Sequence, residues 1–279
     1  MTQKDFILKV PDENRNLKAR LCFPQNAYLD KSQLVIIATG LHSHMDKETQ
    51  TKLAKFYQKS GFVTLQFNFM AHGENKNKSD GDMRDVTLSS GIKDLKTVWD
   101  YAKSFSDKIK PNNIVLIGNS YGALVSLIAS EQNIISPETM ILVAPAFPDK
   151  YKPWILPLKL MITLMPQITS KLFNLTPNMI RDFLNNHSKL MNKENMMGKT
   201  AIKFFVGSKD KISSYSDIQK WCKIFNSQMP NDVPFVDNLQ AHFKIYNGVH
   251  HFKIPEDVQN DINKSSLDFI LKTHALRLR

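Results

Sequence analysis

The chain has 279 residues, of which 42% are hydrophobic and 23% charged, and 37 Lys and Arg outweigh 26 Asp and Glu. This composition excludes a disordered or collagen-like chain, and the length suits one large α/β domain or two smaller ones. No apolar stretch reaches the roughly 18 residues of a membrane helix, no secretory signal is visible, and the cysteines Cys22 and Cys222 are too few for a disulfide framework. We therefore expect a cytoplasmic protein.

Short apolar runs alternate with helical patterns along most of the chain. Several runs, such as LVIIATG and IVLIGN, are continuously apolar, which is typical of strands buried on both faces of a parallel sheet. The first two runs are too close in sequence for a crossover helix, so we expect them to pair antiparallel at one edge. The predicted strands are Phe6–Val10, Asn16–Cys22, Gln33–Gly40, Phe62–Phe69, Asn113–Asn119, Thr139–Phe147, Ala201–Ser208 and Ala241–Tyr246. The predicted helices are Lys47–Ser60, Thr87–Ser104, Tyr121–Glu131, Ser214–Asn226 and Asp257–Thr273.

Residues 150–199 interrupt this alternation. They contain four prolines, six of the twelve methionines and no strand pattern, and they far exceed the dozen or so residues that a crossover connection requires. We interpret them as a helical cap inserted between two parts of an α/β core, residues 1–149 and 200–279. The cap's large apolar side chains either line an acyl tunnel or simply pack the cap onto the core; the tunnel candidates are Trp154, Leu158, Met161 and Met165.

The positive charge is concentrated in the same segment. Of the formal net charge of +11, a net +6 falls within residues 150–199. A basic cap is suited to an acidic headgroup, a carrier protein or a membrane surface. The simpler explanation of the charge, a well-solvated basic surface, is the more common one for charge runs. Nucleic-acid binding is not expected, because no basic stripe is interleaved with aromatic residues.

The strongest local signal is Gly118-Asn119-Ser120-Tyr121-Gly122, which stands between an apolar strand and a helix. A Gly-x-Ser-x-Gly sequence in this context predicts a nucleophile elbow. The glycines relieve crowding around a strained central residue, and the hydroxyl of Ser120 projects from the top of the sheet.

A serine nucleophile requires a base and a carboxylate that orients it. In this architecture the chain order is Ser, acid, His, with the acid and the base in loops after later strands. Asp210 follows the strand AIKFFVGS, and Asp217 is the alternative acid. His250 and His251 follow the strand HFKIYNG, and the register with the following phenylalanine favours His251 as the base. A zinc site of His42, His44, His250 and His251 is disfavoured, because the spacing supplies no shared face.

Three further stretches resemble those of α/β-hydrolases, especially the cinnamoyl/feruloyl-type esterases and monoacylglycerol-lipase-like enzymes. LVIIATG followed by LHSHMDKE resembles the strand-3 loop, FNFMAHGENKNKSDGDMRDVT resembles the family's Asp-x-Arg-Gly-His-Gly-x-Ser stretch, and GSKDKI resembles its acid loop. The sequence departs from the family pattern at Thr39, where a His is usual, and at Ala71 and Asn75. A fatty-acyl thioesterase therefore remains an alternative function, since some of these enzymes have a small residue at the position of Thr39. His72 is expected to be structural.

The resemblance implies an α/β-hydrolase fold with a mostly parallel eight-stranded sheet and a helical cap. It also implies an oxyanion hole formed by the backbone N–H groups of Leu41 and Tyr121, a covalent acyl-enzyme on Ser120, and no metal or organic cofactor. The expected substrate is a small-molecule carboxylic ester or thioester with an apolar acyl group. An acyltransferase, a peptidase and a non-catalytic ligand-binding member of the superfamily remain alternatives.

Overall fold

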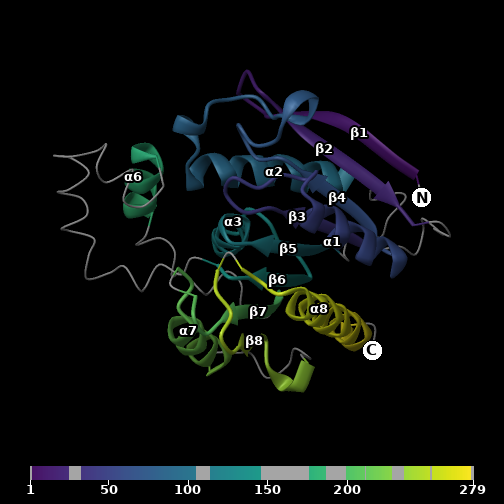
Figure 1. Ribbon diagram of the computed structural model, residues 1–279, viewed down its shortest axis with the longest axis vertical. Coiled ribbons are helices and arrows are strands. Elements are labelled where there is room, and N and C mark those ends of the chain that lie inside the picture. The colour runs from purple at the N-terminus through teal and green to yellow at the C-terminus, as the bar shows by residue number, and fades with distance from the viewer. Residues whose placement is uncertain are drawn as a thin grey trace.

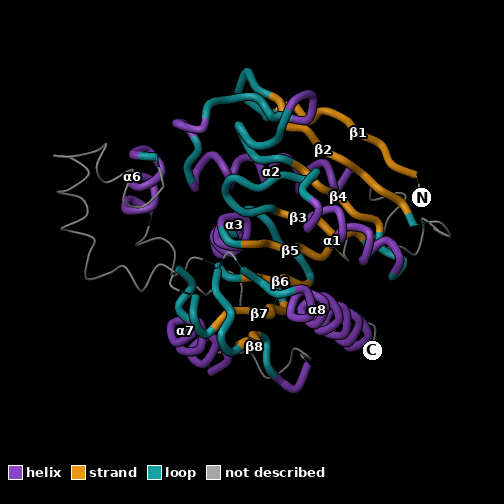
Figure 2. Tube along the Cα trace, in the orientation of Figure 1, coloured by secondary structure: helices purple, strands orange, loops and turns teal. Residues whose placement is uncertain are grey.

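A computed structural model describes residues 2–24, 33–104, 114–145, 176–186, 199–210, 212–227, 236–251 and 253–277. Within them a single eight-stranded sheet crosses the molecule in the order β1-β2-β4-β3-β5-β6-β7-β8 (Figure 2). Strand β2 is antiparallel to both of its neighbours, and the remaining pairs are parallel. The strands are β1 (Thr2–Lys9), β2 (Asn16–Phe23), β3 (Leu34–Ala38), β4 (Val63–Phe67), β5 (Ile114–Asn119), β6 (Thr139–Val143), β7 (Ala201–Gly207) and β8 (Ala241–Tyr246).

Helices cover both faces of the sheet and complete three layers (Figure 1). One face packs against α2, α3 and α7, and the other packs against α1 and α8. The helices are α1 (Glu48–Lys59), α2 (Leu88–Ser104), α3 (Tyr121–Glu131), α6 (Pro177–Asn186), α7 (Tyr215–Ser227) and α8 (Glu256–Arg277), with short 3₁₀ turns η1 (Asn75–Asn77), η2 (Met83–Asp85) and η6 (Val236–Asn238).

The central strands are apolar on both sides because both of their faces are covered. In β3 the side chains of Leu34 and Ile36 enter the core beneath α2, α3 and α7, whereas Val35 and Ile37 enter the core beneath α1 and α8. Successive side chains of a strand point to opposite faces, so an uninterrupted apolar run is what a doubly covered strand requires. The predicted fold class, an α/β-hydrolase sheet flanked by helices, is confirmed.

Two strand boundaries differ from the prediction by more than two residues, and the others agree to within two. Strand β1 begins at Thr2 and not at Phe6, because this edge strand is largely exposed and its outer residues carry no apolar signal. Strand β6 ends at Val143, where the predicted run continued to Phe147, because Ala144 has a φ of 49° and leaves the extended conformation. The predicted antiparallel pairing of the first two strands is confirmed.

The direction in which successive strands are added to the sheet reverses between β3 and β5. From β3 the chain goes next to β4 on one side, and it later returns to β5 on the other side of β3. In open α/β sheets a crevice forms outside the carboxyl ends of the strands at such a switch point, and ligands bind there. Gly40 and Leu41 follow β3, and Ser120 follows β5, so both segments lie at this crevice.

Of the predicted cap, residues 150–199, the structure describes only residues 176–186, which contain α6, and Lys199. Helix α6 is anchored on the start of α2: Asp182 accepts hydrogen bonds from the amide and hydroxyl of Ser89, at 2.9 and 2.6 Å. The predicted tunnel residues Trp154, Leu158, Met161 and Met165 lie outside the described residues. No helix in the described part of the chain has the length and apolar character needed to cross a membrane.

Candidate active site

Ser120 occupies a strained turn between β5 and α3. Its φ of 50° and ψ of −111° fall in a region that non-glycine residues rarely adopt and that costs roughly 1–3 kcal/mol. The turn is held at both ends: the amide of Ser120 donates to the carbonyl of Val143 at 2.9 Å, and its carbonyl accepts from the amide of Leu124 at 3.0 Å. The surrounding structure therefore fixes the serine at the carboxyl end of β5.

The second glycine of the motif is required by the packing of α3 against β3. A Cβ on Gly122 would lie 2.3 Å from the carbonyl oxygen of Ala38 and 2.5 Å from that of Thr39. Such distances are far inside van der Waals contact, so only glycine allows the helix to begin this close to the end of β3. The Gly-x-Ser-x-Gly pattern thus has its structural reason in this close approach.

Three side chains from distant parts of the sequence form one hydrogen-bonded series. The Oγ of Ser120 lies 2.8 Å from Nε2 of His251, and Nδ1 of His251 lies 2.8 Å from Oδ2 of Asp210. The side chains of His251 and Asp210 are 5% and 1% exposed. Nucleophile, base and orienting acid are required within this range of distances.

Both carboxylate oxygens of Asp210 have hydrogen-bond partners. Its Oδ1 accepts hydrogen bonds from the amides of Ile212 and Ser213, each at 2.8 Å, while Oδ2 faces His251. Burial acts to raise the pKa of Asp210, but the hydrogen bond with His251 and those from the two amides outweigh it, so the pKa lies below its ordinary value. The carboxylate is therefore ionised and able to orient an imidazole.

The loops that carry the acid and the base are packed directly against each other. A Cβ on Gly207 would lie 2.2 Å from the carbonyl oxygen of Val249, and the amide of Lys209 donates to that same carbonyl at 3.1 Å. Contact between the two backbones places Asp210 beside His251. Asp217, the alternative acid, lies in the first turn of α7.

His250 is not among the residues that line the cleft around Ser120. It forms an isolated antiparallel bridge with Lys253 and lines a small void behind the acid loop. Among the described residues, no three His, Cys, Asp or Glu side chains are grouped so that they would hold a metal ion.

Of the two residues predicted to supply oxyanion-hole amides, Tyr121 follows Ser120 directly and Leu41 belongs to the loop packed against it. Tyr121 is the first residue of α3, so its N–H has no carbonyl partner within the helix, and the positive end of the helix dipole lies there. A Cβ built on Gly40 would lie 3.4 Å from the Cβ of Ser120, which places the Gly40–Leu41 loop next to the hydroxyl. The arrangement thus brings two candidate donors to the nucleophile from β3 and from α3.

Comparison with known proteins identifies the family. Residues 30–215, two thirds of the chain, match the family described as serine aminopeptidase, S33. The chain belongs to this family. The matched region contains Ser120, Asp210 and the Gly40–Leu41 loop, while His251 lies beyond it.

Several solved structures have the same fold as this S33 family member. Est1E of Butyrivibrio proteoclasticus, in a structure with bound ferulic acid, superposes with a TM-score of 0.68 at 17% identity over 95% of this chain and 99% of that one. A thermostable carboxyl esterase from Bacillus coagulans gives 0.70 at 15% identity, over 98% and 99% of the two chains. An esterase from Pyrococcus furiosus gives 0.68 at 18% identity, over 98% and 91%.

One curated relative is an acyl transferase from Photobacterium phosphoreum. It is 29% identical to this chain over 100 residues, which are 36% of this chain and 31% of the relative. The match therefore spans about a third of the relative's length.

Behind the elbow of this α/β-hydrolase, a buried aromatic cluster fixes the position of Tyr121. Its hydroxyl donates to the carbonyl of Thr87 at 2.6 Å, and its ring stacks on His72, with centroids 6.3 Å apart. Nδ1 of His72 lies 2.7 Å from the carbonyl oxygen of Met70, and burial lowers the pKa of His72. His72 thus lies in the packing behind the elbow, where a structural residue was expected.

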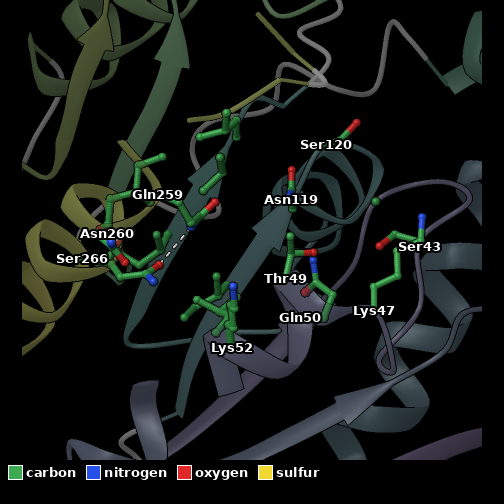
Figure 3. Close-up of a pocket in the computed structure, with 18 of the residues that line it drawn as sticks. Ser43, Lys47, Thr49, Gln50, Lys52, Asn119, Ser120, Gln259, Asn260 and Ser266 are labelled. Atoms are coloured by element: carbon green, nitrogen blue, oxygen red, sulfur yellow. Dashed lines mark hydrogen bonds between the residues drawn. The ribbon is translucent and has the colours of Figure 1, made fainter. Parts of the chain in front are cut away.

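A cleft of about 470 Å³ extends from the candidate triad between α1 and α8, and we call it the α1–α8 cleft (Figure 3). Sequence reasoning missed it, because its polar residues look like the solvated faces of two amphipathic helices. Polar side chains from both helices line it, with Thr49, Gln50 and Lys52 from α1 and Gln259, Asn260 and Asn263 from α8.

Proposed function

We propose that this α/β-hydrolase cleaves carboxylic esters or thioesters through a Ser-His-Asp triad and a covalent acyl-enzyme. The observation that carries the proposal is the hydrogen-bonded series from Ser120 through His251 to Asp210, built on a strained elbow at the switch point of the sheet. Membership of the S33 family and the similarity in fold to solved esterases are consistent with that chemistry.

In the acylation step, His251 accepts the proton of Ser120 through Nε2 as Oγ attacks the acyl carbonyl carbon. Asp210 keeps the proton of His251 on Nδ1 and stabilises the imidazolium that forms. The carbonyl oxygen becomes an oxyanion between the N–H groups of Leu41 and Tyr121. A preorganised donor of this kind lowers the barrier by about 3–4 kcal/mol in enzymes where one has been removed.

Breakdown of the tetrahedral intermediate requires the same residues in reverse roles. The imidazolium of His251 donates its Nε2 proton to the alkoxide or thiolate as the bond from the carbonyl carbon to the leaving group breaks. Water then enters, gives a proton to His251 and attacks the acyl-enzyme, and the acid is released as Ser120 recovers its proton. The hydroxyl and the imidazole that exchange a proton in these steps already lie 2.8 Å apart.

For the acyl group we propose an apolar chain held by the cap, with Trp154, Leu158, Met161 and Met165 as its lining. The basic residues of the cap would then meet an acidic headgroup, a carrier protein or a membrane surface, and the enzyme would act in the cytoplasm. These parts of the proposal rest on the sequence of residues 150–199.

Acyl transfer is the second candidate, and the partial similarity to an acyl transferase supports it. The acyl-enzyme is the same, and an alcohol or thiol takes the place of water. The family is described as a serine aminopeptidase, so a peptidase is also a candidate, and it would use the same triad to cleave an amide bond.

The test is hydrolysis of p-nitrophenyl esters from acetyl to palmitoyl by the wild type and by Ser120→Ala. We expect activity that depends on Ser120 and peaks at longer chains. A folded wild-type protein that hydrolyses none of these esters would contradict the proposal. Added alcohol or thiol acceptors that divert the acyl group from water would favour transfer, and cleavage of aminoacyl p-nitroanilides in preference to esters would favour the peptidase.

A further inference from the structure

The α1–α8 cleft is lined by carboxamide and hydroxyl groups of a kind that an alkyl chain does not need. In Figure 3, Thr49 and Gln50 of α1 face Gln259 and Asn260 of α8 across the cleft, with Asn119 and Ser120 at one end. Leu53, Ile117 and Ile141 add an apolar floor. A site that combines an apolar floor with a few directed polar groups recognises a molecule that is itself part apolar and part hydrogen-bonding.

Gln50 is the residue that points most directly to a ligand. It is only 5% exposed, and its Oε1 has no hydrogen-bond donor within the described chain. A buried acceptor that remains unpaired is costly, so such atoms normally have a hydrogen-bond partner. By contrast, Gln58 on the same helix is equally buried but donates to Thr64 Oγ1 at 3.1 Å.

The opposite wall offers more groups of the same type. Nε2 of Gln259 donates to Oδ1 of Asn263 at 3.0 Å, which leaves the Gln259 carbonyl and the Asn263 amide for other partners. Asn260 stands one residue further along the exposed side of α8. Carboxamides both donate and accept, and therefore they match hydroxyl and amide groups.

The lysines at the mouth of the cleft already have polar partners. Lys52 lies 2.9 Å from Glu48 and 3.8 Å from Glu256 across the cleft, and Nζ of Lys47 donates to the carbonyl of His42 at 2.8 Å. Beyond these charged side chains at its mouth, the cleft presents neutral carboxamide and hydroxyl groups at its walls. An anionic group would have to displace these existing pairs.

From these observations we infer that the α1–α8 cleft binds the non-acyl half of the substrate, a neutral group that carries hydroxyls or amides. This inference rests on the proposed ester or thioester hydrolysis, since it places the leaving group on the α1–α8 side of Ser120. The volume of about 470 Å³ is many times the roughly 30 Å³ that one water occupies, so it accommodates more than the attacking water.

The experiment compares three substrates with the same octanoyl group: ethyl octanoate, 1-octanoylglycerol and S-octanoyl-N-acetylcysteamine. The first has a bare alkyl leaving group, the second offers hydroxyls and the third an amide. For each enzyme, kcat/KM on a polar substrate is divided by kcat/KM on ethyl octanoate, which cancels intrinsic reactivity when variants are compared. Gln50→Leu removes the buried carboxamide with little change in size, and Gln58→Leu is the matched control outside the cleft.

We expect Gln50→Leu to lower this ratio by about tenfold or more for the glycerol ester, the cysteamine thioester or both, and Gln58→Leu to leave it within about threefold of the wild type. The substrate whose ratio falls identifies the source of the polar group. If Gln50→Leu does not fold, Asn260→Leu, at an exposed position of the same cleft, is expected to lower the same ratio.

Unchanged ratios in the folded cleft variants, with hydrolysis still dependent on Ser120, would overturn the inference and leave the proposed function standing, with only water in the cleft. Absence of Ser120-dependent hydrolysis on all three substrates would instead remove the proposed function and, with it, the inference.

Discussion

Replacing Asp210 by Asn tests the orienting role of the carboxylate. Asp210 accepts three hydrogen bonds, one at Oδ2 from Nδ1 of His251 and two at Oδ1 from the amides of Ile212 and Ser213. An asparagine has one acceptor oxygen, so its NH₂ group must face either the two amides or the imidazole. An unpaired buried donor costs about 1–3 kcal/mol, so facing the amides costs roughly twice as much as facing His251.

The asparagine NH₂ should therefore point at His251. Nδ1 of the imidazole then becomes the acceptor, the proton moves to Nε2, and Ser120 loses its base. In Ser-His-Asp enzymes this tautomer change lowers kcat by about 10⁴-fold. At about 1.4 kcal/mol per factor of ten, this corresponds to about 5.5 kcal/mol of transition-state stabilisation.

The assay is the rate of p-nitrophenyl octanoate hydrolysis at neutral pH, with thermal unfolding as a check that the variant is folded. Asp217→Asn is the matched control, because Asp217 is the other acid near the end of β7 and its carboxylate belongs to α7. If Asp210→Asn retained turnover within about tenfold of the wild type, or if Asp217→Asn were equally impaired, the reasoning would be refuted.

Three further substitutions test the packing behind the site. Gly122→Ala forces a Cβ to 2.3 Å from a backbone carbonyl of β3, so we expect at least about 3 kcal/mol lost in urea unfolding; a loss below about 1 kcal/mol would contradict the close approach. Arg15→Met leaves the buried carboxylate of Asp94, 2.5 Å from Nη1, without its cation, which we expect to cost about 3 kcal/mol. Burial already raises the pKa of Asp94 to about 6, and removing the guanidinium raises it further. The variant's loss of stability relative to the wild type should therefore grow as the pH rises above about 6, and a pH-independent loss would argue against this pair. Tyr121→Phe removes the hydrogen bond to Thr87 and should lower the melting temperature by roughly 2 °C, whereas an unchanged value would mean that this bond contributes nothing.

Much of the fold could be predicted from the sequence because its pattern is set by burial. Runs such as that of β3 are apolar at every position, which is typical of strands with both faces covered. The elbow could also be recognised, since Gly118 and Gly122 are dictated by local sterics that leave a fixed spacing around Ser120. The ends of an exposed edge strand such as β1 are harder to predict, because its residues carry little apolar signal.

Buried polar groups could not be predicted in the same way. Gln50 and Asp94 lie on helices whose charged and amide residues have the pattern of a solvated face, yet both are buried. Their burial depends on which helices meet in three dimensions, and hydrophobic periodicity carries no information about that. The amides of Ile212 and Ser213 that hold Asp210 are likewise main-chain groups with no signature in the sequence.

The most direct test of the central claim is covalent labelling with a fluorophosphonate, followed by mass spectrometry of the digested protein. The account predicts that the wild type is labelled on the peptide that contains Ser120, that Ser120→Ala is unlabelled, and that His251→Ala is labelled far more slowly because Oγ has lost its base. A folded wild-type protein that is left unlabelled at Ser120, or is labelled at a different residue, would contradict it.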